Sequence, residues 1–132
     1  MSEVTDVILI VDPGDDAGAE DLSFWMASNE PRSDDRTTSR VGPLTPLTGA
    51  VGEELWGGSK AIGFSLWGAV TNNLDWDRFL ERVEETEWSQ SERLQLLMKE
   101  DGDTYFRLYM FRDGKLSNFA PADPAGGYEP RP

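Results

Sequence analysis

The sequence contains no cysteine and no histidine. Without cysteine the chain has no disulfide bonds and no thiol nucleophile, so nothing indicates a secreted, disulfide-stabilised domain. Without histidine it lacks the most common general base at neutral pH, and a Ser-His-Asp triad is excluded. The two residue types that best bind transition metals are therefore both missing. These absences argue against an enzyme, and we expect no catalytic residue, no cofactor and no metal.

Long apolar runs are also missing. The most hydrophobic run, Val7 to Val11, is five residues long, too short for a signal sequence or a membrane span. The residues before it carry no basic cluster. We therefore expect a cytoplasmic protein that does not enter a membrane.

Acidic residues, in contrast, are abundant. The 132 residues include 25 Asp and Glu against 12 Lys and Arg, giving a net charge of -13. Such a charge attracts basic partners and repels nucleic acid. It also has a simpler explanation, because negative charge keeps proteins soluble. We expect a basic protein partner and no bound nucleic acid.

The length and patterning indicate a single domain. Val7–Val11 is a strand that ends at the turn Asp12–Asp16, and its unbroken apolar character predicts an interior strand covered on both faces. From Lys60 to Val70 a second strand is expected. The more apolar face of this strand would carry Ile62, Phe64, Leu66 and Val70. The other face would carry Ala61, Gly63, Ser65 and Trp67.

The clearest helix covers residues 75–87. Asp75 is a good N-cap, and the helical spacing of Trp76, Phe79, Leu80 and Val83 predicts one buried stripe. Strands follow at 93–99, 105–111 and 115–119, joined by the turns Asp101-Gly102 and Asp113-Gly114.

The segment 13–58 is less regular. We expect a long excursion containing one short helix at 19–28 and one irregular strand. That helix would bury its four large apolar side chains, Leu22, Phe24, Trp25 and Met26. The predicted fold class is therefore α+β: an antiparallel (mixed) sheet of about four to six strands, with one main helix (75–87) packed on one face. The domain spans 1–120, and a Pro/Gly-rich tail covers 121–132.

Candidate contact residues come from the acidic turns and the tryptophans. Much of the acid excess falls in the loop 12–35 and around the hairpin 100–103, and Trp56 and Trp67 are candidate interface residues, with a place in the core as the alternative for each. The predicted partner-binding residues are Asp15, Asp16, Trp56, Trp67, Glu100, Asp101 and Asp103. The turn 12–16 also suggests an alternative, because Asp12, Asp15 and Asp16 would be the Mg²⁺ ligands of an acid-dependent enzyme.

The C-terminal half resembles a known family. Leu94–Asp103, followed by Tyr105–Leu116, is similar to the type 7 immunity family of bacterial polymorphic toxin systems. The likeness also includes Asn72-Asn73 before the helix and covers residues 60–120. It implies a non-catalytic inhibitor that binds a toxin, often a basic nuclease. A second hypothesis is a phage or mobile-element anti-defence protein, in the form of a nucleic-acid mimic.

Overall fold

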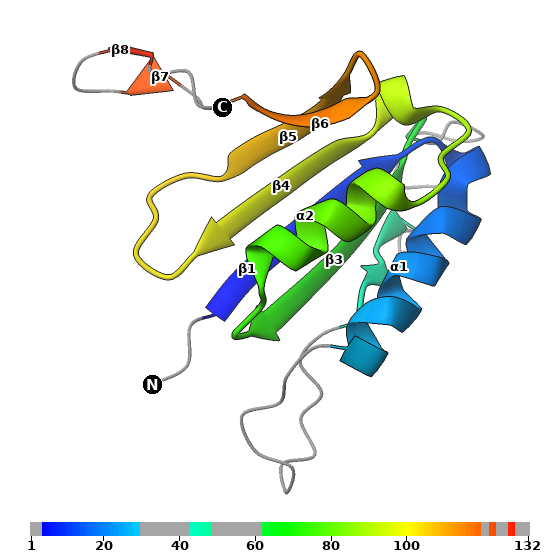
Figure 1. Ribbon diagram of the computed structural model, residues 1–132, viewed down its shortest axis with the longest axis horizontal. Coiled ribbons are helices and arrows are strands. Elements are labelled where there is room, and N and C mark those ends of the chain that lie inside the picture. The colour runs from blue at the N-terminus through cyan, green and yellow to red at the C-terminus, as the bar shows by residue number, and fades with distance from the viewer. Residues whose placement is uncertain (1–3, 30–42, 49–61, 120–121, 124–126, 129–132) are drawn as a thin grey trace, which may run out of the picture.

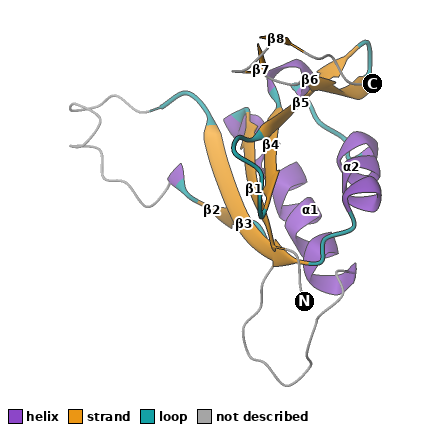
Figure 2. Ribbon diagram, turned by 90° about the vertical axis from the view of Figure 1, so that its left-hand side faces the viewer, coloured by secondary structure: helices purple, strands orange, loops and turns teal. Residues whose placement is uncertain are grey.

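The chain folds as an α+β protein with one antiparallel sheet. The computed structural model describes residues 4–29, 43–48, 62–119, 122–123 and 127–128. Six strands are paired in the order β2-β3-β1-β4-β5-β6, and two helices lie on the same side of the sheet (Figures 1 and 2). The bounds are β1 Val4–Val11, α1 Asp16–Asn29, β2 Thr45–Pro46, β3 Ser65–Asn72, α2 Trp76–Glu85, β4 Gln95–Glu100, β5 Arg107–Arg112 and β6 Lys115–Phe119. Short 3-10 turns precede α1 and β4 at Pro13–Asp15 and Ser91–Arg93, and β7 (Ala122–Asp123) pairs with β8 (Gly127–Tyr128).

Strand β1 lies inside the sheet, between β3 and β4, as its sequence predicts. The expectation that both of its faces are covered is wrong. Burial alternates along the strand, so that Val7 and Leu9 are buried beneath the helices while Ile8 and Ile10 are only half-buried on the other face. The reason is that both helices pack on one side of this antiparallel sheet.

The faces of β3 are the reverse of those predicted. Trp67 lies opposite Leu9 in the register with β1, and residues opposite one another share a face. Trp67 is therefore in the core at 5% exposure, whereas Val70, on the supposed buried face, is 55% exposed. The indole Nε1 donates a 3.1 Å hydrogen bond to Asp16 Oδ1, so the one polar group of Trp67 is satisfied inside.

Helix α1 begins three residues before the predicted start at residue 19. The preceding 3-10 turn is capped by Asp12, whose Oδ2 accepts a 2.8 Å bond from Gly14 N. Ala19, Leu22 and Met26 form the buried side of the helix. The expected burial of Phe24 is wrong, because Phe24 lies about 200° around the helix from Leu22 and is 73% exposed.

Helix α2 follows its sequence signals closely. Asp75 caps it by accepting a bond from Arg78 N at 3.2 Å, and Phe79 and Val83 are fully buried. The turn at Asp113-Gly114 has positive φ at both positions, 52° and 79°, as a type I′ hairpin requires. The predicted excursion 13–58 contains α1 and β2, and its residues 30–42 and 49–58 lie outside the described residues.

Candidate functional site: an acidic groove between the helices

The start of α1 is fastened to the segment after α2 by a buried carboxylate. Asp15 is 4% exposed. Its oxygens accept three hydrogen bonds: from Ser89 N at 2.7 Å, Ser89 Oγ at 3.0 Å and Gln90 N at 2.9 Å. The side chain therefore fixes the position of the connecting segment and is not presented to a partner.

A second close contact lies beside this carboxylate. A Cβ at Gly18 would come within 2.7 Å of the Trp88 ring, so only glycine allows α1 and the indole to approach this closely. The Trp88 Nε1 donates a 2.9 Å bond to the carbonyl of Val83 in α2. Together these contacts hold the first turns of α1 beside the C-terminal end of α2 (Figure 1).

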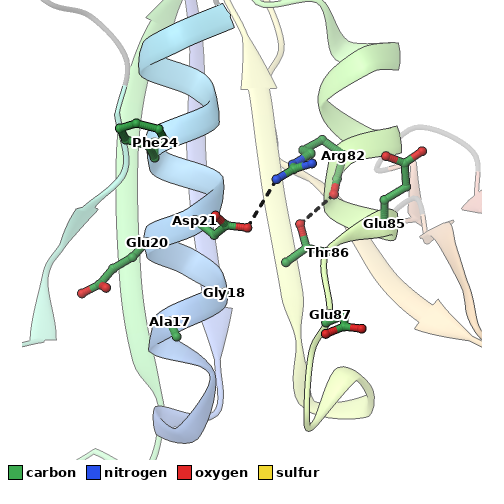
Figure 3. A pocket seen from close by; sticks show the side chains of 9 residues that line it. All are labelled: Ala17, Gly18, Glu20, Asp21, Phe24, Arg82, Glu85, Thr86 and Glu87. Carbon is green, nitrogen blue, oxygen red and sulfur yellow. Dashed lines mark hydrogen bonds and ion pairs between the residues drawn. The ribbon is translucent and has the colours of Figure 1, made fainter.

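The two helix ends border an open groove of about 610 Å³ (Figure 3). It is lined by Ala17, Gly18, Glu20, Asp21 and Phe24 of α1 and by Arg82, Glu85, Thr86 and Glu87 at the end of α2. Asp21 and Arg82 point toward one another across it, with 3.3 Å between carboxylate and guanidinium. Thr86 Oγ1 donates to the Arg82 carbonyl at 2.8 Å and closes the last turn of α2.

Carboxylates dominate the charge of this groove. Arg82 is the only cation in its lining, and Asp21 already pairs with it, which leaves Glu20, Glu85 and Glu87 uncompensated by the groove's own residues. The side of α2 that faces β6 adds further acids at Asp77, Glu81 and Glu84, and Glu84 Oε1 accepts a 3.0 Å bond from Leu116 N. Among the described residues, the cations outside the helices are Arg93, Lys99, Arg107, Arg112 and Lys115, on β4–β6 and the turns that border them. Among the described residues, α1 and α2 together carry seven acids against two arginines, so the helix layer has an excess of negative charge.

The acids at the end of α2 oppose the helix dipole, whose negative end lies there. Glu85 is also four residues from Glu81, a spacing at which like charges repel on a helix. We expect Glu85→Gln to raise the free energy of unfolding by about 0.5 kcal/mol at low salt. Urea denaturation at 20 mM and 1 M NaCl checks this, because salt should remove the gain. Glu20→Gln, near the N-terminal end of α1, is the matched control, and an equal gain there would contradict the dipole argument.

The residues predicted from sequence do not form one surface. Asp15 and Trp67 are interior and are therefore not placed to contact a partner, and the half-buried Asp16 accepts the bond from Trp67. Trp56 lies outside the described residues.

The hairpin at 100–103 lies at the far end of the sheet from the turn at 12–16. Asp101 N donates to the Val4 carbonyl at the start of β1, while Asp12 follows the end of that strand. The eight residues of β1 separate them by roughly 25 Å. Asp103 is engaged locally, accepting a 3.0 Å bond from Glu100 N and pairing with Arg107 at 3.6 Å.

The three carboxylates of the proposed magnesium site point to different partners. Asp12 pairs with Arg93 at 2.6 Å, Asp15 binds the segment after α2, and Asp16 accepts from Trp67. Within the described parts of the chain, no group of three or more acidic side chains is placed to hold a metal ion. The geometry therefore gives no support to magnesium at this turn.

Phe24 is the residue that the sequence reasoning missed. The sequence predicts Phe24 in the core, yet it lines the groove as the most exposed large apolar side chain among the described residues. The signal was present in the spacing, because Ala19, Leu22 and Met26 already complete the buried stripe and leave Phe24 outside it.

Comparisons with known proteins add no relative. No protein-family model matches the sequence, and no curated protein or solved structure is significantly similar to it. Among the described residues, no helix has the length and apolar character needed to cross a membrane.

Proposed function

We propose that this protein is an acidic, non-catalytic binding protein, of the kind that acts as an immunity-type inhibitor and neutralises a basic partner such as a toxin nuclease. The observation that carries the proposal is the concentration of carboxylates on the helix layer, around a groove whose single arginine is already paired. A nuclease must present cations to its phosphate substrate, so an acidic surface is complementary to its active site.

The position of the carboxylates favours a role in binding over a role in solubility alone. Solubility depends on net charge and is served by acids placed anywhere on the surface. Here Glu85 lies in the last turn of α2 with Glu87 just beyond, where the helix dipole makes negative charge unfavourable. An arrangement that costs stability is expected where function requires it.

Charge of this kind acts mainly on the rate of association. A one-sided field of several kT concentrates an oppositely charged partner and speeds its encounter by roughly 10- to 1000-fold at low ionic strength. At physiological salt the field acts over about 8 Å, so the carboxylates around the groove would steer a partner only over its final approach. Contacts in the groove would then determine how long the complex lasts.

The test is capture followed by an activity assay. The tagged protein is incubated with lysate of its own cells in 50 mM NaCl, and retained proteins are eluted with 1 M NaCl. We expect a basic protein to elute and its toxic or nuclease activity to be suppressed by an equimolar amount of this chain. Retention of no cationic protein, or full activity of the captured protein in the complex, would contradict the proposal.

A nucleic-acid mimic is the second candidate, favoured by the acids along α2. Asp77, Glu81 and Glu85 are spaced by four residues and form a row on one side of the helix. A mimic should displace duplex DNA from several unrelated DNA-binding proteins, whereas an immunity-type inhibitor should act on one partner alone. Competition assays against a panel of basic DNA-binding proteins distinguish the two.

A further inference from the structure

Four arginines among the described residues each lie over an aromatic ring. They are Arg93 over Phe64 at 4.7 Å, Arg107 over Trp76 at 5.3 Å, Arg112 over Phe119 at 5.5 Å and Arg78 over Trp25 at 5.9 Å. The distances, measured from guanidinium carbon to ring centroid, lie within the range of cation–π attraction.

Two of these arginines also pair with a carboxylate. Arg93 binds Asp12 at 2.6 Å while it covers Phe64, and Arg107 pairs with Asp103 at 3.6 Å while it covers Trp76. The guanidinium suits this double contact because it is planar, stacking through its face and donating hydrogen bonds through its edge. Ring, acid and arginine thus form a three-part unit that the fold uses twice.

Phe24 has the ring and the acids of this unit. Glu20 and Asp21 precede it by four and three residues, which places their Cβ atoms about 5–6 Å from that of Phe24. Figure 3 shows Glu20 and Phe24 one above the other on the side of α1 away from α2, while Asp21 points across the groove to Arg82. The ring is 73% exposed, and no described arginine lies over it.

We propose that the α1 edge of the groove receives an arginine side chain from the basic partner, seated over the Phe24 ring with Glu20 as its carboxylate. The inference rests on the proposed function and adds the chemistry that the partner must present. Covering the ring removes apolar surface from water, and Glu85 and Glu87 provide negative charge for neighbouring cations of the same segment. Lysine cannot stack and pair in the same way, because its ammonium is a compact, strongly hydrated charge.

Nona-arginine and nona-lysine are the defined probes for this site. Isothermal titration calorimetry in 50 mM NaCl is expected to give the arginine peptide an affinity about tenfold higher than the lysine peptide, as a cation–π contact of about 1.4 kcal/mol would produce. Phe24→Leu, which keeps an apolar side chain and removes the ring, should reduce the preference to within about twofold. Nona-lysine affinity should change little. Amide chemical shifts should move along α1 in the wild type.

Two control variants make the test specific. Val70→Ala trims an exposed apolar side chain on the opposite face of the sheet and should leave the arginine preference intact. Glu20→Gln should lower the preference for the arginine peptide. Equal affinities for the two peptides, or a preference that survives Phe24→Leu, would overturn the arginine site. If both peptides bind equally and salt releases both, the charge-based function stands while the arginine site fails.

Discussion

Replacing Asp15 with alanine is expected to lower the free energy of unfolding by about 3 kcal/mol. The carboxylate is buried and accepts bonds from Ser89 N, Ser89 Oγ and Gln90 N. Alanine would leave two backbone N–H groups without the buried carboxylate that accepts their bonds. The cost exceeds that of an ordinary surface substitution because bonds to a charged acceptor are lost while their donors stay behind.

Urea denaturation monitored by tryptophan fluorescence measures the change, and Asp21→Ala, in the helix that follows the turn, is the matched control. Asp21 makes an exposed ion pair with Arg82, so its loss should cost less than about 1 kcal/mol. Asp15→Asn should fall between the two, because one amide oxygen remains to accept. A loss for Asp15→Ala no larger than that for Asp21→Ala would show that the three bonds contribute little.

The same substitution should also disturb the groove. Ser89 and Gln90 follow Glu87, which lines the groove, so releasing them frees one wall at the end of α2. The carboxylate that fixes the fold at this point thereby positions the candidate site.

The elements that the sequence predicts correctly are those with local signals. Helix α2 has its own cap at Asp75 and its own buried stripe, and the hairpin at Asp113-Gly114 needs nothing beyond two residues that tolerate positive φ. The antiparallel α+β class follows from these elements, because short turns place successive strands side by side. Each signal depends on residues within a few positions of one another.

The misplaced residues depend on contacts between distant segments. Trp67 is buried because β3 pairs with β1 in a register that puts it opposite Leu9, 58 positions earlier in the chain. Asp15 is buried because a segment 74 residues away folds over it. The local spacing of residues indicates neither burial. An acidic turn is predicted to be solvent-exposed unless the segment that packs over it is known.

The candidate site shows the same division. The acid excess is visible in the sequence, but the candidate contact residues come from the turn at 12–16 and the hairpin at 100–103, which the length of β1 keeps apart. The groove lies instead where the antiparallel helices meet, and the sequence predicts its exposed Phe24 ring in the core. The composition predicts that the protein is negatively charged, whereas the topology determines where the acidic groove lies.

Reversing the charge at the end of α2 separates binding from stability, because the two should change in opposite directions. In the double variant Glu85→Lys/Glu87→Lys, lysines replace carboxylates near the negative end of the helix dipole, so the free energy of unfolding should rise by about 1 kcal/mol. The association rate with a basic partner should fall by about 10- to 100-fold in 50 mM NaCl, because the steering field around the groove is cancelled.

Surface plasmon resonance with the captured basic protein, and with nona-arginine as a defined probe, measures the rates. The matched control is Glu100→Lys/Asp101→Lys, which makes the same change of net charge at the hairpin on the far end of the sheet. It should slow association by no more than about threefold, since a charge beyond the Debye length is largely screened. If the hairpin variant lost the partner and the α2 variant kept it, the binding surface would lie where the sequence alone placed it, and the groove would not be the site.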